Sequence, residues 1–171
     1  MNREFDVIIY GASGFTGRLV AEYMGNTYGR SINWAMAGRN AVKLADVRDE
    51  IGASPDTPLV TADADDLDSL REMVKSAQCI CSTVGPYQLY GSDLVKLCAE
   101  EGTHYVDLSG EPGWMHDMIA AHHETARASG ARIVHSCGFD SIPFDLGVYF
   151  LQQHAIKTTG EPMPRIRGRV R

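Results

Sequence analysis

The chain has 171 residues, of which 44% are hydrophobic and 22% charged, which is typical of one globular domain with room for the start of a second. This composition excludes disordered and fibrous proteins, and no apolar stretch reaches the roughly 18 to 20 residues of a membrane-spanning helix. The net charge of −6 divides into +4 over residues 157–171 and −10 over the rest. The acidic body argues against nucleic acid as the main partner.

The N-terminal residues and the cysteines indicate where in the cell the protein is expected to be. Residues 1–6 carry charges of both signs and do not resemble a signal peptide, so we expect a cytoplasmic protein without a transmembrane segment. The cysteines are Cys79, Cys81, Cys98 and Cys137. Cys79 and Cys81 share one face of a predicted strand, which favours packing. His135 and Cys137 match no zinc spacing, and we expect no metal site.

The predicted strands and helices alternate along the chain. In chain order they are a strand at 5–10, a helix over 18–24, a strand at 32–37, a helix over 41–50 capped by Asn40, a strand at 59–62, a helix ending at 76 and capped by Asp65 or Asp66, a strand at 77–84, a helix over 92–101, a strand at 104–108, a helix over 112–129, a strand at 132–136 and a helix over 143–154. Parallel strands need such crossover helices, so we expect an α/β fold, a doubly wound parallel sheet in the order 3-2-1-4-5-6. Ligands then bind at the carboxyl ends of the strands, between the first and the fourth.

Residues 157–171 do not continue the alternation of strands and helices. Residues 157–164 contain a glycine and two prolines and are expected to be a connector. Residues 165–171 alternate arginine with Ile166, Gly168 and Val170, which is the period of a strand. We therefore expect a boundary near residues 156 to 164, with 1–156 as one domain and 157–171 as a linker and the first strand of a second domain.

The sharpest motif lies between the first strand and the first helix and has the spacing G-x-x-G-x-x-G. Gly11 permits a tight turn, Gly14 lets the backbone approach a pyrophosphate, and Gly17 lets the helix pack close to the sheet. The backbone N–H groups and the helix dipole then face the phosphates. Ser13 and Thr16 are placed to add hydroxyl contacts, and each could equally serve the turn itself. The context of strand, turn and helix favours a dinucleotide site over an ordinary glycine-rich turn.

The end of the second strand indicates which dinucleotide binds. A carboxylate there would favour NAD, but the chain has Arg39, whose guanidinium suits a 2'-phosphate, with Gly38 leaving space. The charge therefore favours NADP over NAD. Asp63 follows the third strand and is placed either to meet the adenine edge or to cap the next helix.

The remaining strand ends would lie near the nicotinamide. After the fourth strand come Thr83, Val84, Gly85 and Pro86, which we expect on the nicotinamide side. Tyr87 and Tyr90 are candidate proton donors, and Glu111 and Asp140 are candidates for acid-base work, with helix capping at least as good an interpretation of both carboxylates. No tyrosine has a lysine four residues later, so the mechanism of short-chain dehydrogenases is not supported.

Five blocks of the chain together resemble the saccharopine dehydrogenase-like oxidoreductases, in particular the branch that includes trans-acting enoyl reductases. They are Tyr10-Gly-Ala-Ser-Gly-Phe-Thr-Gly17, Ala37-Gly-Arg39, Val84-Gly-Pro-Tyr87 with Tyr90-Gly91, Thr103-His-Tyr-Val-Asp-Leu-Ser-Gly-Glu111 and Cys137-Gly-Phe-Asp-Ser-Ile-Pro143. The resemblance implies an N-terminal Rossmann domain that binds NAD(P). In full-length relatives a second α/β domain follows, which completes the substrate site and often the dimer. Members differ in reaction, so the resemblance supplies no catalytic residue.

The sequence therefore predicts an NADP-dependent oxidoreductase acting on a small-molecule or acyl substrate, with this chain as its cofactor-binding domain. The pyrophosphate would be held by Gly11, Ser13, Gly14, Phe15, Thr16 and Gly17. Arg39 would hold the 2'-phosphate. The alternatives are a module that binds or senses a dinucleotide without turnover and, more remotely, a thiol or metal site at His135 and Cys137.

Overall fold

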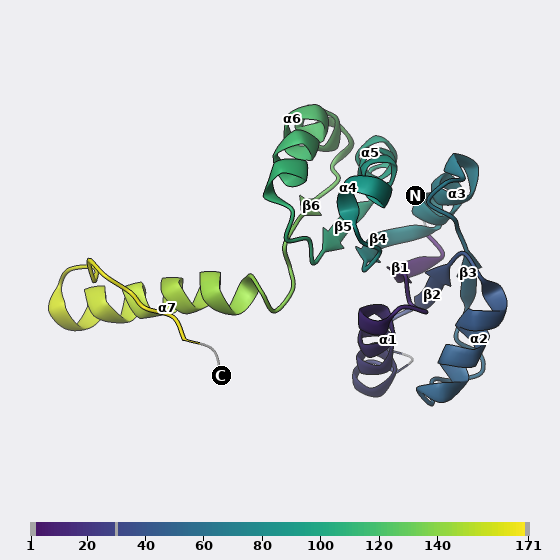
Figure 1. Ribbon diagram of the computed structural model, residues 1–171, viewed down its shortest axis with the longest axis horizontal. Helices are drawn as coiled ribbons and strands as arrows, with labels where there is room; N and C mark the ends of the chain where they lie inside the picture. Colours follow the sequence, from purple (N-terminus) through teal and green to yellow (C-terminus); the bar gives the residue numbers. More distant parts are fainter. Residues whose placement is uncertain (1–2, 30, 170–171) are drawn as a thin grey trace.

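The computed structural model describes residues 3–29 and 31–169 and has a doubly wound α/β fold (Figure 1). The strands are β1 Phe5–Tyr10, β2 Trp34–Gly38, β3 Leu59–Thr61, β4 Ala77–Ser82, β5 His104–Asp107 and β6 Ile133–Val134. The helices are α1 Phe15–Thr27, α2 Ala41–Glu50, α3 Leu67–Ser76, α4 Tyr87–Tyr90, α5 Ser92–Glu101, α6 Pro112–Ser129 and α7 Ile142–Thr159. The strands run parallel in the order β3-β2-β1-β4-β5-β6, which confirms the predicted fold class and strand order.

Several helix ends follow directly from the sequence. The Asn40 side chain accepts a hydrogen bond from the Lys43 N–H at 2.9 Å and so begins α2. Asp66 begins α3 in the same way, accepting from the Ser69 N–H. Gly102 ends α5 with a φ of +68°, a conformation that costs glycine little. These caps satisfy backbone groups that a helix end leaves without partners.

Helices cover the two faces of the sheet unequally. On one face α1 and α2 pack on β1 and β2, with Ile9 and Leu44 fully buried between them. On the other face α3, α5 and α6 pack on a second core that includes Ile8, Leu70 and Tyr105 (Figure 1). From β1 the chain builds the sheet outward through β2 to β3, and from β4 it builds outward in the opposite direction through β5 to β6. Because the crossovers in both halves are right-handed, the two sets of helices lie on opposite faces. The carboxyl ends of all six strands meet at one edge.

The last helix and the residues after it differ from the prediction. A helix is predicted to end at residue 154, but α7 continues to Thr159, so the predicted connector starts inside it. Gly160, with a φ of +86°, ends α7, and the chain then runs back along it, where Gln152 exchanges two hydrogen bonds with Met163 (Figure 1). Residues 165–169 form no strand, because no partner strand lies beside them in the described chain; residues 170 and 171 lie outside the described residues. No helix that the structure describes is long and apolar enough to cross a membrane.

Candidate functional site

The glycine turn connects β1 to α1, and two of its positions, Gly11 and Gly17, require glycine. Gly11 has a φ of +88°, and a Cβ at position 17 would lie 2.1 Å from the Gly11 carbonyl oxygen. Gly14 occupies the N-cap of α1, where no side chain caps the helix and no acidic residue lies in the first turn. The amide groups of residues 15–17 therefore face the carboxyl edge with no side-chain acceptor from the protein, whereas the Gly14 N–H donates to the Gly11 carbonyl at 2.9 Å. Such an open helix N-terminus favours an anion.

A pocket of about 300 Å³ opens at this edge, between the turn and the ends of β2, β3 and β4. Its lining includes predicted residues from three separate segments, namely Gly11, Ser13, Gly14, Arg39, Thr83, Val84 and Gly85. The Gly11 N–H donates to the Ala37 carbonyl at 2.9 Å, and the Thr83 N–H donates to the Tyr10 carbonyl at 2.9 Å. These bonds fix the turn against β2 on one side and against the loop after β4 on the other.

Arg39, Asp63 and Asp65 form the charged wall of the pocket. The Arg39 side chain is exposed and, within residues 3–29 and 31–169, makes no hydrogen bond or ion pair. Burial raises the pKa of Tyr10 to about 12, and the negative charge of Asp63 adds to this while Arg39 opposes it, so all three groups lie close together. Asp63 accepts from the Asp65 N–H, which gives it a role in the local turn. The Arg39 guanidinium is thus available to bind an anionic group of a ligand at this wall.

Four predicted residues lie beside the pocket or behind it. Phe15 and Thr16 are exposed in the first turn of α1, and Gly17 is buried where α1 meets the turn. Pro86 follows Gly85 through a cis peptide bond and precedes α4. The lining also includes Tyr10 and Asp65, which were not predicted there. Tyr10 ends the predicted strand at 5–10 and Asp65 lies three residues after the predicted strand at 59–62, and this nearness to strand ends was the available signal.

The catalytic candidates Tyr87 and Glu111 are engaged in structural contacts. The Tyr87 hydroxyl donates to the Ser82 carbonyl at 3.1 Å and accepts from the Leu108 N–H at 3.4 Å, and burial raises its pKa to about 12. Glu111 accepts from the Tyr87 and Gln88 N–H groups, both at 2.8 Å. It therefore caps α4, a helix that the sequence did not predict, rather than α6, which it directly precedes.

Asp140 lies far from the glycine turn in chain order and outside the pocket. Its side chain is exposed in the turn before α7, where Ser141 is the N-cap and no side chain caps the helix. The predicted capping role of Asp140 is therefore absent. Tyr90, in contrast, lines the pocket and is exposed.

A buried pair that the sequence reasoning missed joins the ends of β5 and β6. Asp107 Oδ2 accepts from His135 Nδ1 at 2.7 Å, with the side chains 0% and 7% exposed. Asp107 Oδ1 also accepts from the Ser109 and Ser136 N–H groups. Burial alone would raise the pKa of Asp107, but the bonds from His135, Ser109 and Ser136 outweigh it and leave the pKa below its usual value. The carboxylate therefore stays charged and fixes both loops.

His135 and Cys137 are not arranged around a metal. The Cys137 thiol contacts the Val134 carbonyl at 3.5 Å, while the His135 ring packs edge-on against Trp114. In the described part of the chain, no group of three or more His, Cys, Asp or Glu side chains is placed to hold an ion.

Comparison with known proteins identifies the family of the chain. The model of the saccharopine dehydrogenase NADP binding domain matches residues 7–134. The chain belongs to this family. A relative from Mycobacterium tuberculosis (strain ATCC 25618 / H37Rv) is 48% identical over 159 residues, 92% of this chain and 38% of the relative. The trans-acting enoyl reductase of Mycobacterium leprae (strain TN) is 45% identical over 161 residues, 93% of this chain and 38% of the relative.

Solved structures with low identity share the fold. The apo saccharopine dehydrogenase (L-Glu forming) from Saccharomyces cerevisiae has a TM-score of 0.60 and 17% identity, over 90% of this chain and 30% of that one. The triphenylmethane reductase of Citrobacter sp., complexed with NADP(H), has a TM-score of 0.55 and 15% identity, over 91% of this chain and 55% of that one. The chain spans about two fifths of the length of the curated relatives quoted above.

The family match has a clear extent on the structure. The matched residues 7–134 include every residue that lines the pocket at the carboxyl ends of the strands, from Tyr10 to Tyr90. The match ends before His135 and α7. The chain therefore carries an NADP-binding domain of the saccharopine dehydrogenase family, an oxidoreductase type of domain.

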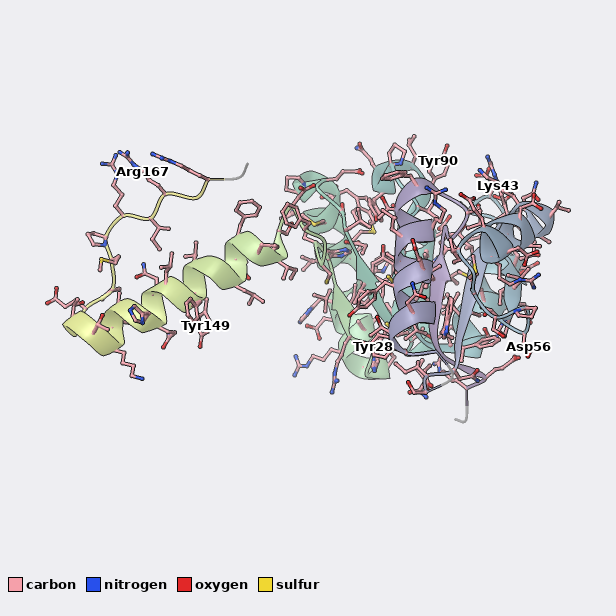
Figure 2. The ribbon with its side chains drawn as sticks, turned by 90° about the horizontal axis from the view of Figure 1, so that it is seen from below. Tyr28, Lys43, Asp56, Tyr90, Tyr149 and Arg167 are labelled. Carbon is pink, nitrogen blue, oxygen red and sulfur yellow. The ribbon has the colours of Figure 1, made fainter. Side chains whose placement is uncertain are left out.

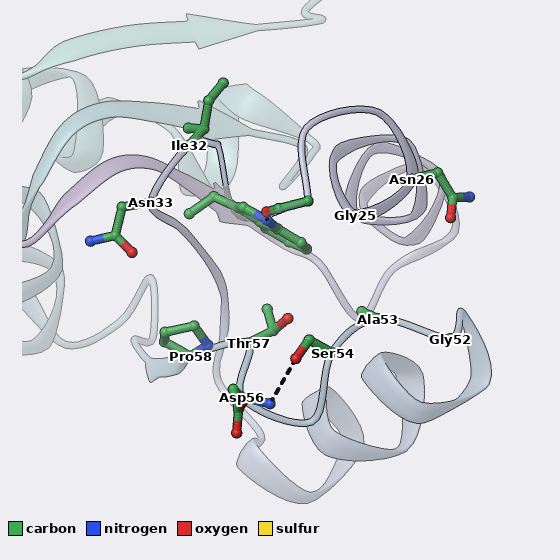
Figure 3. Close-up of a pocket in the computed structure, with 12 residues that line it drawn as sticks. Gly25, Asn26, Ile32, Asn33, Gly52, Ala53, Ser54, Asp56, Thr57 and Pro58 are labelled. Atoms are coloured by element: carbon green, nitrogen blue, oxygen red, sulfur yellow. Dashed lines mark hydrogen bonds between the residues drawn. The ribbon is translucent and has the colours of Figure 1, made fainter.

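A larger cavity of about 380 Å³ lies at the other edge of the sheet and is unrelated to this pocket (Figure 3). Trp34, the first residue of β2, and Pro58, just before β3, line it, so it opens at the amino ends of the strands. Figure 2 shows Asp56, from this cavity, and Tyr90, from the cofactor pocket, at opposite ends of the domain. Parallel sheets bind nucleotides at the carboxyl ends, which favours the smaller pocket.

Proposed function

We propose that this chain is the cofactor-binding part of an NADP-dependent oxidoreductase that reduces a carbon–carbon double bond in an acyl substrate. The observation that carries the cofactor assignment is the pocket where the open N-terminus of α1 and the unpaired Arg39 of the described chain meet. The reaction class is supported by the name of the Mycobacterium leprae relative, a trans-acting enoyl reductase.

Each predicted residue has a role that fits its place at the edge. The backbone of the turn would hold the pyrophosphate, through Gly11, Ser13, Gly14, Phe15, Thr16 and Gly17. Arg39 would hold the 2'-phosphate with its guanidinium. The nicotinamide side would rest against the loop after β4, at Thr83, Val84, Gly85 and Pro86. The glycine turn and the loop after β4 lie in close contact, since a Cβ on Gly11 would come within 2.7 Å of Thr83 Oγ1.

The chemistry is divided between the cofactor and the protein. NADPH supplies a hydride, which in an enoyl reduction adds to the β-carbon while a proton adds to the α-carbon. The pocket residues bind and orient the cofactor and exclude water from its buried side. Tyr87 is committed to Ser82 and Leu108, and Asp140 lies outside the pocket, so we assign neither as the proton donor.

We propose that the substrate site and the proton donor belong to the part of the longer relatives that this chain does not span. In this division, residues 1–156 bind the cofactor and residues 157–171 lead into a second domain. A cytoplasmic location is supported by the four free cysteines, since thiols persist in reducing compartments.

Turnover distinguishes this function from a non-catalytic dinucleotide sensor. The longer protein that contains this chain is incubated with NADPH and a panel of enoyl and ketoacyl thioesters, and NADPH absorbance is followed. Steady consumption with an enoyl thioester is expected, and it should slow in the Arg39→Ala variant at low NADPH concentration. Tight NADPH binding without consumption on any thioester would refute the enzyme and favour the sensor.

A further inference from the structure

The loop after β4, residues 83–86, is held at both of its ends, and we call it the nicotinamide loop. At its start, the N–H and the hydroxyl of Thr83 donate to the Tyr10 carbonyl at 2.9 and 3.0 Å. At its far end, the first two N–H groups of α4 donate to the two carboxylate oxygens of Glu111, both at 2.8 Å. The first contact comes from β1, beside the glycine turn, whereas the second comes from the loop after β5.

Between these two contacts, the backbone of the nicotinamide loop is open to a ligand. Val84 and Gly85 line the pocket, and in the described part of the chain neither of their N–H groups makes a hydrogen bond. A Cβ on Gly85 would meet the Tyr87 ring at 3.6 Å, so this ring lies directly against the loop. Tyr87 is buried and packs on Trp114, with the ring centroids 5.4 Å apart. The position of Gly85 in the pocket therefore depends on where the start of α4 is held.

Glu111 is itself held by a buried network of hydrogen bonds. The Ser109 hydroxyl accepts from the Glu111 N–H at 3.2 Å, and the Ser109 N–H donates to Asp107 Oδ1 at 3.0 Å. The other oxygen of Asp107 is paired with His135. Because Ser109 and Asp107 are buried, water competes little for these bonds. The network thus connects β6 and β5 to the start of α4.

Helix capping alone does not account for this arrangement. A cap is normally supplied by the residue directly before the helix, and here that residue is Pro86, which has no side-chain acceptor. The acceptor comes from Glu111, 23 and 24 positions away in the chain. A helix of one turn has little stability of its own. Gly85 and Tyr90, on either side of the bonds to Glu111, both line the pocket, so the bonds fix the pocket wall (Figure 2).

We propose that Glu111 is the positioning residue for the nicotinamide half of the cofactor: its carboxylate fixes the start of α4 and so keeps the nicotinamide loop in its binding conformation. This role rests on the proposed function, since it takes the ligand of the loop to be the nicotinamide of NADPH. Glu111 does not line the pocket and acts through the loop. Arg39 and the glycine turn share no hydrogen bond with Glu111 in the described chain. Loss of the carboxylate should therefore weaken only the nicotinamide half.

Two ligands separate the halves of the site, namely NADPH and adenosine 2',5'-bisphosphate, which carries the 2'-phosphate without a nicotinamide. Each is titrated calorimetrically into the chain. Glu111→Ala should weaken NADPH by about tenfold, because a loop that is no longer held must be ordered on binding, and fixing the backbone of one residue corresponds to about 5- to 30-fold in affinity. The bisphosphate should change by less than about twofold, as expected for a distant site without shared partners. Glu111→Gln keeps one acceptor oxygen and should lie between wild type and Glu111→Ala.

Three measurements accompany these titrations. Arg39→Ala should weaken both ligands by about tenfold, since both carry the 2'-phosphate. Glu72→Ala is the matched control and should change neither, because Glu72 is exposed on α3, lies outside the pocket and makes no hydrogen bond in the described chain. Amide hydrogen exchange at Tyr87 and Gln88 should be faster in Glu111→Ala, and thermal unfolding checks that each variant is folded.

The two ligands also separate a positioning role from general damage to the domain. Equal weakening of both ligands in Glu111→Ala would overturn the role of Glu111. An unchanged NADPH affinity in a variant whose two amides exchange faster would overturn it as well, as would a wild type that binds NADPH no more tightly than the bisphosphate. A failure of the proposed function gives a different result, in which the wild type binds neither ligand or Arg39→Ala leaves both unchanged. That result would overturn the role of Glu111 together with the cofactor site.

Discussion

Gly17 is the position where the glycine turn tolerates least change. A Cβ at this position would lie 2.1 Å from the Gly11 oxygen and 2.7 Å from Thr83 Oγ1. Non-bonded atoms do not approach so closely, so in Gly17→Ala the Gly11 carbonyl must move by about 1 Å. That oxygen accepts the Gly14 N–H at 2.9 Å, so its movement also displaces the amide groups that face the pocket.

This displacement should lower both the stability of the domain and its affinity for NADPH. Overpacking in a well-packed region lowers the free energy of unfolding by about 1 to 3 kcal/mol. In a domain of this size each kcal/mol corresponds to about 2 to 4 °C, so the melting temperature should fall by about 2 to 12 °C. A misplaced turn should also weaken NADPH binding by about tenfold, since this corresponds to only about 1.4 kcal/mol of lost contacts.

Thermal unfolding with and without NADPH measures both effects. The matched control is Gly113→Ala in the first turn of α6, because a Cβ there meets no atom within 4 Å. The control should melt at the wild-type temperature or up to about 4 °C above it and keep its shift on NADPH addition, since alanine favours a helix by up to about 1 kcal/mol over glycine. If Gly17→Ala melts like the control and binds NADPH equally well, the close contact at the turn does not determine the site.

Two further predictions concern the strand ends. Because the folded-state pKa of Asp107 is lowered, its stabilisation is present above its unfolded pKa and is lost as pH falls through the folded value. Asp107→Asn should therefore unfold about 2 kcal/mol more easily than the wild type in denaturant at pH 7, and the difference should shrink between about pH 5 and pH 2; a constant difference would contradict the charged pair. Tyr87→Phe should melt about 2 to 4 °C lower but slow turnover of the longer enzyme less than about tenfold, whereas a loss of about 100-fold or more would make Tyr87 the proton donor.

Much of the fold could be predicted because local signals and long-range order agree. Asn40 and Gly102 mark helix ends through their own backbone and side-chain preferences, and both are confirmed. The alternation of strands and helices requires crossovers, and crossovers of one hand lead to the order β3-β2-β1-β4-β5-β6. The residues of the pocket come together for the same reason, since carboxyl ends of parallel strands meet at one edge.

The features that were missed depend on contacts between distant residues. α4 is only four residues long and is capped by Glu111, which lies 23 or more positions away in the chain. The pair of Asp107 and His135 depends on the register between β5 and β6, which the sequence does not give. The predicted strand after residue 164 needs a partner strand that the described chain does not contain.

The selectivity for NADPH tests the central claim most directly. The chain is titrated with NADPH and NADH in separate calorimetric experiments, together with Arg39→Ala and with Lys43→Ala, an exposed cation on α2 that does not line the pocket. NADPH should bind the wild type more tightly than NADH, and Arg39→Ala should weaken NADPH about tenfold, NADH less than about twofold, and Lys43→Ala neither. NADPH that binds no tighter than NADH, or an Arg39→Ala variant that weakens both equally, would contradict the assignment of Arg39 to the 2'-phosphate.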